Sequence, residues 1–228
     1  EDPSEGLWQL NQNGGNDRQF KEVFDEFGLP EALRQAVGTA CENIVDQNCI
    51  KLRNGAVISV LDDHIGKSIA RTKIHYEPEL ISYVKRFISP KRVIDVGANI
   101  GNHALGFSGH KDYSVTCFEP DLSLAELAIS NLEKNGVKYK MFTHGLGASE
   151  GRLNFVPGPP SNRGIGRFVR DAEEGIEIPV RPLDSVLPGS PVDLIKIDVE
   201  GFEFEVLLGA IRIIEANKPA LVIEHANY

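Results

Sequence analysis

The chain has 228 residues, 41% of them hydrophobic and 25% charged, as in an ordinary globular protein. Its formal net charge of −9 argues against nucleic acid as a partner, because binding to phosphates requires a basic face. Its apolar runs are too short to span a membrane and no signal peptide is visible, so we expect a cytoplasmic protein without a transmembrane segment.

The first part of the chain is predicted to form an N-terminal extension, or cap, ahead of the catalytic core. Apolar residues at helical spacing predict one helix that begins near Asp17 and a second that begins at Pro30. A short apolar run after a turn predicts a strand over residues 56–60. We therefore expect a helical and strand extension over residues 1–75 and the main domain over residues 76–228.

From residue 76 onward, short apolar strands alternate with amphipathic helices. This pattern is typical of a mostly parallel sheet covered by helices on both faces, so we predict an α/β, Rossmann-like fold. One helix is predicted over residues 79–88, and another over residues 121–135 with Asp121 as its N-cap and Gly136 just past its end. The predicted strands of the central sheet cover residues 92–96, 114–119, 139–143, 193–198 and 220–225.

Two features lie outside this alternation. Further strands are predicted over residues 151–156 and 176–180, on either side of a loop over residues 157–170 that is rich in Gly, Pro and Arg. This loop either closes over an anionic or polyhydroxylated acceptor or is an ordinary mobile loop. The basic residues at 85–86 and 91–92 are interpreted as solvated charges near a helix end.

A glycine turn follows the first strand of the predicted sheet. In open α/β sheets, ligands bind beyond the carboxyl ends of the strands, and Gly97 and Gly101 allow the backbone to approach a ligand there. Asn99 stands where a dinucleotide-binding turn has its second glycine, and Asp95 would repel a pyrophosphate but organise an ammonium group. The turn therefore favours an aminoacyl ligand, such as the methionine moiety of S-adenosylmethionine, over NAD.

An acid ends the second strand of the predicted sheet. Glu119 stands 18 residues after Gly101, where a carboxylate would bind both hydroxyls of a ribose. Taken alone, the glycines are explained by a tight turn and Glu119 by a surface acid. The joint spacing favours a cofactor site.

Charged residues alternate with apolar ones along the fourth strand. Lys196, Asp198 and Glu200 should share one face of the sheet. A lysine inside a central strand needs a partner, so we predict that a Lys–Asp pair ties Lys196 of this strand to a helix. Asp198 and Glu200 emerge at the carboxyl edge, where the ligand is expected.

These segments together resemble the FkbM family of methyltransferases, and the resemblance covers about two thirds of the chain. It implies a class I methyltransferase fold and the transfer of a methyl group from S-adenosylmethionine, typically to oxygen. The run over residues 196–201 is its most specific element. The matching segments are residues 76–78, 93–101, 118–120, 183–185, 193–201 and 218–225.

The resemblance also implies a role for individual residues. Glu119 would hold the ribose, Gly145 and Leu146 would border the adenine, and Asp198 and Glu200 would lie near the reactive methyl group. The methionine portion would be held by Asp95, Gly97, Asn99 and Gly101.

The chain departs from the family pattern in two places. His103 stands where the family often has an aromatic residue, and we expect it to be a packed or partly exposed histidine. The sequence ends just after the fifth strand, without the β-hairpin that usually follows. Either this variant lacks the hairpin, or the sequence is truncated and the N-terminal region covers the sheet edge.

Methyl transfer to a hydroxyl needs in-line positioning and a group that accepts a proton or stabilises charge. The candidates are Asp198, Glu200 and the pair Glu224-His225, in which the histidine has an ordinary pKa of about 6.5. His225 is alternatively a strand-end histidine with one structural hydrogen bond. Asp198 with Glu200 or Glu224 could instead hold a divalent metal such as magnesium through oxygen ligands.

Three classes of function are consistent with these features. The leading one is an O-methyltransferase acting on a sugar, glycolipid or small natural product. The second is a nicotinamide-dependent oxidoreductase, which the missing glycine pattern disfavours. The third is a non-catalytic scaffold that keeps the cofactor site. The sequence leaves the acceptor and the oligomeric state open.

Overall fold

A computed structural model describes residues 48–169 and 175–224. The two helices predicted between Asp17 and Val45 lie outside these residues, as does His225.

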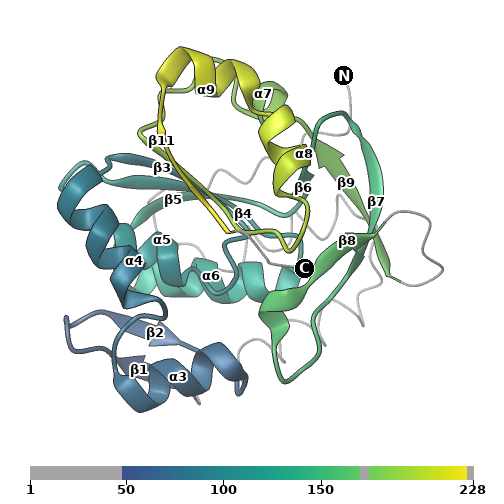
Figure 1. The fold of residues 1–228 in the computed structure, drawn as a ribbon. Coiled ribbons are helices and arrows are strands. Elements are labelled where there is room, and N and C mark those ends of the chain that lie inside the picture. The colour runs from purple at the N-terminus through teal and green to yellow at the C-terminus, as the bar shows by residue number, and fades with distance from the viewer. Residues whose placement is uncertain (1–47, 170–174, 225–228) are drawn as a thin grey trace, which may run out of the picture.

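A five-stranded parallel sheet forms the centre of the molecule (Figure 1). Its order is β11-β10-β3-β4-β5, and every neighbouring pair is parallel. The strands are β3 (Arg92–Val96), β4 (Ser114–Phe118), β5 (Lys138–Phe142), β10 (Leu194–Ile197) and β11 (Ala220–Ile223). All five strands agree with the sequence prediction to within two residues at each end, and the predicted parallel sheet is confirmed.

Helices cover both faces of this sheet, one layer below it and one above it in Figure 1. Strand β3 shows why, because successive side chains of a strand point to opposite faces of the sheet. Its consecutive residues Val93 and Ile94 belong to two separate hydrophobic clusters, one on each face. The layer below contains α4 (Pro78–Tyr83), α5 (Asn102–Phe107) and α6 (Leu122–Lys134), and the layer above contains α7 (Leu183–Val186), α8 (Glu203–Leu208) and α9 (Ile211–Asn217).

Local signals explain where the predicted helices begin and end. The side chain of Asp121 accepts hydrogen bonds from the backbone of Ser123 (3.0 Å) and Leu124 (3.4 Å), so it caps α6 as predicted. Gly136 follows this helix with a positive φ of 63°. The helix predicted over residues 79–88 is divided, because α4 passes into a π-helical turn, η1 (Val84–Ile88).

A second sheet lies beside the carboxyl ends of the central strands (Figure 1). Its order is β6-β9-β7-β8, and its strands are β6 (Gly145–Leu146), β7 (Gly151–Val156), β8 (Arg167–Val169) and β9 (Ile176–Arg181). The predicted strands at 151–156 and 176–180 are confirmed. The intervening segment is not simply a loop, because it contains a 3-10 turn, η2 (Arg163–Ile165), and strand β8.

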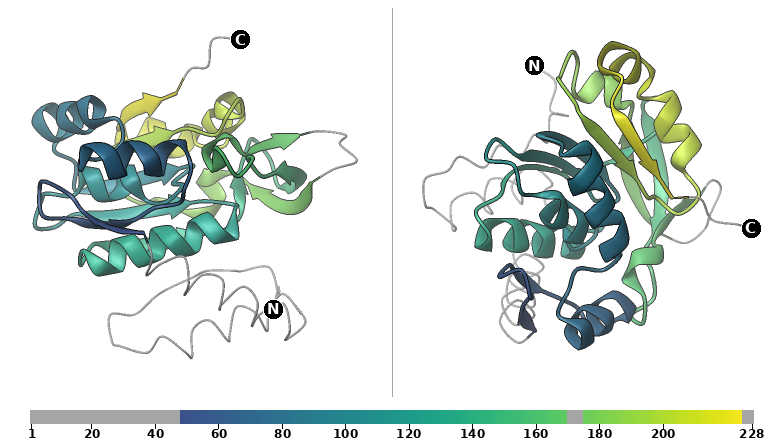
Figure 2. Two further views of the ribbon diagram at one scale, coloured as in Figure 1. Left: turned by 90° about the horizontal axis from the view of Figure 1, so that it is seen from below. Right: turned by 60° about the vertical axis from the view of Figure 1, so that its left-hand side comes forward.

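The described part of the N-terminal region packs on the same core as the sheet. It consists of β1 (Cys49–Lys51), β2 (Val57–Ser59) and α3 (His64–Thr72). The buried Asn131 of α6 accepts a hydrogen bond from the Ser59 N–H (2.7 Å) and donates to the Ser59 carbonyl (2.9 Å), which ties β2 to this helix. These residues therefore lie against α6 and not along β11, as the two further views also show (Figure 2).

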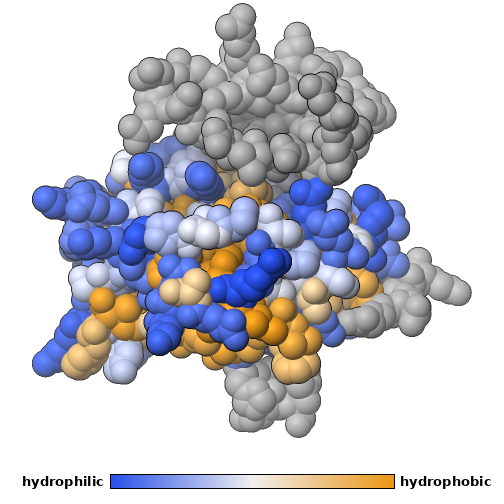
Figure 3. All heavy atoms as spheres, turned by 90° about the horizontal axis from the view of Figure 1, so that it is seen from above, coloured by the Kyte–Doolittle hydropathy of each residue, from blue (hydrophilic) through white to orange (hydrophobic). Residues whose placement is uncertain are grey.

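The outer face above the sheet carries several exposed apolar side chains (Figure 3). They belong to α8, the first turn of α9 and strand β11, and they are Phe204, Leu208, Ile211, Leu221 and Ile223. None of the helices in the described ranges has both the length and the apolar character needed to cross a bilayer.

Candidate cofactor and acceptor site

The central sheet has a topological switch point between β3 and β10. From β3 the chain moves outward through β4 and β5, and it later returns to the other side of β3 at β10. Ligands bind at such points, beyond the carboxyl ends of the strands. A cavity, partly open to solvent, lies there. Its walls include Gly97, Asn99, Phe118, Glu119, His144, Gly145, Leu146, Arg163, Phe168 and Asp198.

The glycine turn lies at the bottom of this cavity, and packing explains its glycines. Gly97 has a φ of 75°, and a Cβ atom there would stand 1.8 Å from the Asp198 carbonyl oxygen. Gly101 has a φ of 76° and packs against Ala128 of α6, where a Cβ atom would come within 3.2 Å. The atoms that leave no room for a side chain at these two glycines thus belong to the protein itself, namely to the Asp198 backbone and to α6. Gly97 and Asn99 also face the cavity.

Glu119 is buried beside this turn and is not a surface acid. One carboxylate oxygen accepts the Asn99 N–H (2.8 Å) and the other accepts the Asp121 N–H (2.9 Å). Burial raises the pKa of this carboxyl group to about 7, although the two backbone hydrogen bonds act to lower it. Glu119 therefore joins the glycine turn to the start of α6 and lines the cavity between them.

The predicted Lys–Asp pair forms, but it joins the neighbouring strands β10 and β3 instead of a strand and a helix, and it has a second acid. The Lys196 ammonium lies 3.1 Å from Asp95 and 3.1 Å from Asp198, and it donates a hydrogen bond to the Gly97 carbonyl (2.8 Å). Burial alone would lower the pKa of Lys196, but the two carboxylates outweigh it and raise the pKa above its usual range. Lys196 thus holds the glycine turn and Asp198 in one ionic network.

Asp95 lies beneath the cavity and not in its wall. Its side chain is fully buried, and its partner is the ammonium group of Lys196. Among the described residues no group donates a hydrogen bond of ordinary geometry to its oxygens, so the lysine supplies its compensating charge. The geometry gives Asp95 a part in supporting the turn from below.

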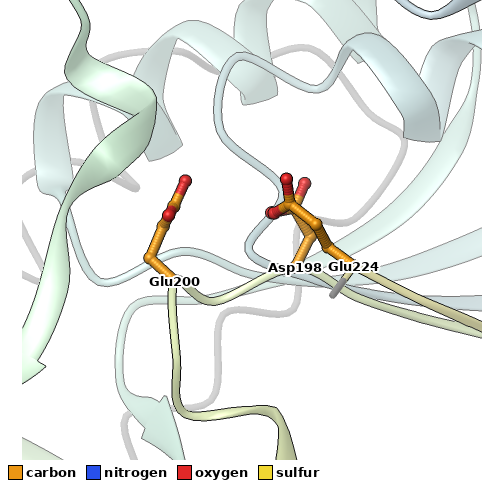
Figure 4. A group of neighbouring side chains, drawn as sticks. All are labelled: Asp198, Glu200 and Glu224. Carbon is orange, nitrogen blue, oxygen red and sulfur yellow. The ribbon is translucent and has the colours of Figure 1, made fainter. Parts of the chain in front are cut away.

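Three carboxyl groups meet at the carboxyl ends of β10 and β11 (Figure 4). Asp198, Glu200 and Glu224 each place an oxygen within 4.8 Å of the other two. A side-chain hydrogen bond joins Asp198 to Glu224. We call these three residues the acidic cluster. Because Asp198 also lines the cavity, the acidic cluster borders the cofactor site.

Asp198 and Glu224 differ in pKa, so the proton of their hydrogen bond belongs mainly to Glu224. Although burial opposes it, the Lys196 charge lowers the pKa of Asp198 to about 2, with help from the Glu224 hydrogen bond. The hydrogen bond to Asp198, with burial, raises the pKa of Glu224 to about 8. Burial and the Asp198 charge also raise the pKa of Glu200, whose backbone has a left-handed φ of 53°.

A Glu–His pair lies near the acidic cluster, because His103 helps to lower the pKa of Asp198 and Glu77 helps to raise the pKa of Glu224. The His103 Nε2 atom lies 3.1 Å from a carboxylate oxygen of Glu77, and this contact lowers the pKa of Glu77. His103 is buried, as expected for a packed histidine, and stacks on Phe107 at 5.7 Å between ring centroids. Sequence reasoning gave neither residue a role in the site. Its only signal was the Tyr-Glu-Pro sequence over residues 76–78.

The far end of the cavity is built by β6 and the second sheet. Gly145 and Leu146, which were predicted to border the adenine, line the cavity, and a Cβ atom on Gly145 would come within 2.4 Å of the Phe168 ring. His144 was missed by the sequence analysis. It lies against Phe118, with ring centroids 5.6 Å apart.

The connection from β7 to β8 covers this end of the cavity. Its Arg163 is hydrogen-bonded to the Asp121 carboxylate and to the Ser123 hydroxyl (3.1 Å). The Ser161 carbonyl accepts the His64 N–H (3.0 Å) at the start of α3. Contacts with α6 and α3 therefore hold this connection in place.

The parallel sheet, its switch-point cavity and the acid that ends its second strand define a Rossmann-like domain for a nucleoside-containing cofactor. The model of the Methyltransferase FkbM domain matches residues 95–228, and the chain belongs to this family. The resemblance stated from the sequence is confirmed.

A curated relative is the hexuronic acid methyltransferase AglP of Haloferax volcanii, which is 29% identical over 135 residues. The match covers 58% of this chain and 55% of that protein, so the chain spans about half the length of the relative.

Two solved structures are similar in part. The methyltransferase FkbM from Methylobacillus flagellatus is 21% identical, with a TM-score of 0.46, and the match covers 92% of this chain and 60% of that one. The O-methyltransferase TomG from Streptomyces achromogenes, solved with S-adenosylmethionine, is 19% identical, with a TM-score of 0.34, over 54% of this chain and 43% of that one.

Proposed function

We propose that this protein is an S-adenosylmethionine-dependent O-methyltransferase whose acceptor is a hydroxyl group of a sugar, glycolipid or small natural product. The observation that carries the proposal is the position of Asp198. This residue lines the switch-point cavity and also belongs to the acidic cluster, so a cofactor in the cavity would end beside groups that accept protons. Membership of the FkbM methyltransferase family supports the same reaction.

The cavity fits S-adenosylmethionine in the chemistry of its walls. The turn over residues 97–101 would hold the methionine portion, supported from below by Asp95 and Lys196. The Glu119 carboxylate would accept hydrogen bonds from the ribose hydroxyls. The adenine would lie toward Gly145 and Leu146, where His144 and Phe168 supply aromatic walls.

The methyl group of the cofactor is already activated, so the protein's main task is to orient the acceptor for in-line attack. As the acceptor oxygen bonds to the methyl carbon, the carbon–sulfur bond breaks and the hydroxyl proton must leave. We assign the proton to Glu224, the member of the hydrogen-bonded pair with the higher pKa, in its ionised form. Lys196 fixes Asp198 in this pair, and Glu200 lies at the edge of the same cluster.

The acidic cluster also fits a divalent cation such as magnesium. Its three carboxylate groups are the oxygen ligands that such ions prefer, and Asp198, Glu200 and Glu224 would be the residues that hold it. When bound there, the ion would stabilise the negative charge that develops on the acceptor oxygen.

The name of the relative from Haloferax volcanii supports a glycan acceptor, since that protein is a hexuronic acid methyltransferase. We therefore place sugars first among the acceptors to be tested, ahead of other natural products.

An acceptor screen with methyl-labelled S-adenosylmethionine tests the proposal. Uronic acids, neutral sugars and phenols are offered with magnesium and with a chelator, and we expect label to move to a sugar hydroxyl. Calorimetry runs in parallel with S-adenosylhomocysteine and with NAD. Binding of NAD alone would favour the oxidoreductase, and tight binding of S-adenosylhomocysteine without transfer to any acceptor would favour the scaffold.

A further inference from the structure

A second hollow, distinct from the cofactor cavity, is lined by residues of α4, of η1 and of the turn between β1 and β2. Figure 1 shows where these elements lie. The hollow is widely open to solvent. Its lining comes from the turn between β1 and β2, the segment after α3, and the face of α4 and η1. We call it the cationic groove.

Charge distinguishes this groove from the rest of the molecule. Arg53, Lys85 and Arg86 line it, and no carboxylate does. None of these three side chains forms an ion pair with an acid in residues 48–169 or 175–224. The Arg86 guanidinium lies over the Phe87 ring, 5.2 Å from its centroid, and keeps its charge there. In a chain with a net charge of −9, three cations without an acidic partner around one hollow give a locally positive field.

The basic residues at 85–86 and 91–92, which the sequence grouped as solvated charges near a helix end, fall into two groups in the structure. Arg92 makes a salt bridge with Asp193 at 2.7 Å, as an ordinary surface charge does. Lys85 and Arg86 instead face the groove together with Arg53, which is more than thirty positions away in the sequence. Sequence spacing gave no sign that this third cation joins them.

The inner wall of the groove is neutral and polar. The His75 Nδ1 atom lies 3.2 Å from the Asn102 side-chain oxygen, and its Nε2 atom lies 3.3 Å from the Asn54 amide nitrogen. In this arrangement Nδ1 donates and Nε2 accepts, which requires the neutral imidazole. The positive charge therefore comes from the three long side chains at the rim.

The floor of the groove is apolar. Ile74, Pro78 and Ile81 line it together with Gly106 of α5, where a Cβ atom would come within 2.5 Å of Ile81. The groove thus combines cations at its rim with a surface suited to the apolar face of a sugar or an alkyl group.

We propose that the cationic groove binds the oxyanion group, a phosphate or carboxylate, of an organic ligand whose remaining part lies on the apolar floor. The two arginines offer paired N–H donors that match a planar carboxylate or a phosphate, and Lys85 adds a third charge. This site is separate from the cofactor cavity, and its existence does not depend on the methyl-transfer reaction.

A short segment, residues 75–77, nevertheless connects the groove to the acceptor region. His75 faces the groove, while Glu77 of the same segment pairs with His103 beside the acidic cluster. Asn102 holds the residue between them, because it accepts the Tyr76 N–H (3.0 Å) and donates to the Tyr76 carbonyl (3.0 Å).

Calorimetry at low and high salt tests the proposal, with glucose 1-phosphate, glucuronate, inorganic phosphate and neutral glucose as probes. We expect the organic anions to bind more tightly than glucose and to lose affinity as salt rises. Comparison of glucose 1-phosphate with glucuronate identifies the preferred oxyanion. Comparison with inorganic phosphate shows the contribution of the floor. Equal binding of glucose and the anions, or no binding of any anion, would overturn the proposal.

Matched variants locate the site. The double variant Arg53→Gln, Arg86→Gln should weaken binding of the preferred anion by at least about tenfold, because it removes two guanidinium groups that donate charge-assisted hydrogen bonds to the anion. The variant Lys91→Gln removes an exposed charge outside the groove and should bind like the unchanged protein. The affinity for S-adenosylhomocysteine and the melting temperature report on the fold. An anion affinity that falls equally in both variants would contradict the assignment.

Discussion

At the scale of single residues, Glu119 connects ligand binding to a proton. Its carboxyl group has a pKa of about 7 in the free protein, because it is buried. Two ribose hydroxyls donate stronger hydrogen bonds to the ionised carboxylate, which offers two charged acceptor oxygens, so binding of the cofactor should favour that form. Binding of the cofactor at low pH must therefore be accompanied by the release of a proton from Glu119.

We predict that the affinity for S-adenosylhomocysteine increases as pH rises through 7 and levels off above it. Well below the pKa, the dissociation constant should change by about tenfold per pH unit. Calorimetry in buffers of different ionisation enthalpy measures the released proton directly. Glu119→Gln should bind weakly with no pH dependence, whereas Glu215→Gln, on the exposed side of α9, should behave normally. A flat profile in the unchanged protein would contradict the assigned ribose contact.

The second prediction at this scale separates binding from chemistry. Glu224→Gln removes one member of the proton-accepting pair but leaves the cavity walls intact, because Glu224 lies outside them. Turnover should fall by roughly 10²-fold or more, the usual contribution of a general base. The affinity for S-adenosylhomocysteine should stay within about twofold of the original value. Full turnover in this variant would show that Glu224 is not the proton acceptor.

Single residues also show what the sequence could not predict. Alternation along β10 placed Lys196 and Asp198 on one face, and this was sufficient to predict a Lys–Asp pair. Lys196 reaches Asp95 because the two residues are in register across neighbouring strands, and register between β10 and β3 requires the folded sheet. The contact between Glu77 and His103 is likewise tertiary, so periodicity carried no information about it.

At the scale of elements, the long strands, α6 and the short strand β2 could be predicted, while other short elements could not. Strands β1 and β8 have three residues each, too few for alternation to be recognised. The change from α4 to the π-helical turn η1 was invisible because apolar spacing remains helical across it. Strand β8 matters most, since Phe168 from it forms part of the cavity wall.

The connection between β7 and β8 gives the prediction at this scale. Arg163→Ala removes its bonds to Asp121 and Ser123, so the connection should open more often and the cofactor should dissociate faster. We expect the dissociation constant for S-adenosylhomocysteine to rise by about tenfold, which corresponds to losing a charge-assisted hydrogen bond. Stopped-flow measurement of release provides the test. Arg167→Ala, an exposed position at the start of β8, is the control, and equal rates in the two variants would contradict this role.

At the scale of the whole molecule, the N-terminal region and the sheet share one hydrophobic core. Ile58 and Ile69 belong to the same cluster as Val93 and Leu132. The boundary predicted at residue 75 is a change of sequence pattern, and the described residues before it pack as part of the domain. Asn131 makes the central polar contact, since it bonds Ser59 on one side and the Ile100 carbonyl (2.8 Å) on the other.

We predict that Asn131→Ala lowers the free energy of unfolding by about 2–4 kcal/mol, because several buried backbone groups lose their partners. Asn135→Ala is the matched control. It removes similar bonds to Val57, but the site is partly exposed and water can replace them, so the loss should be smaller. Urea unfolding measures both values. Similar losses in the two variants would show that burial does not decide this contact.

The contact between Gly97 and the Asp198 carbonyl has a consequence for how the reaction tolerates change. Backbone meets backbone there, so the separation between the glycine turn and the end of β10 is fixed by main-chain geometry and not by the choice of rotamers. Under the proposed function, substrate preference could then be altered from the surrounding loops without moving the turn that holds the cofactor. We expect related chains to differ in what they methylate while keeping this contact unchanged.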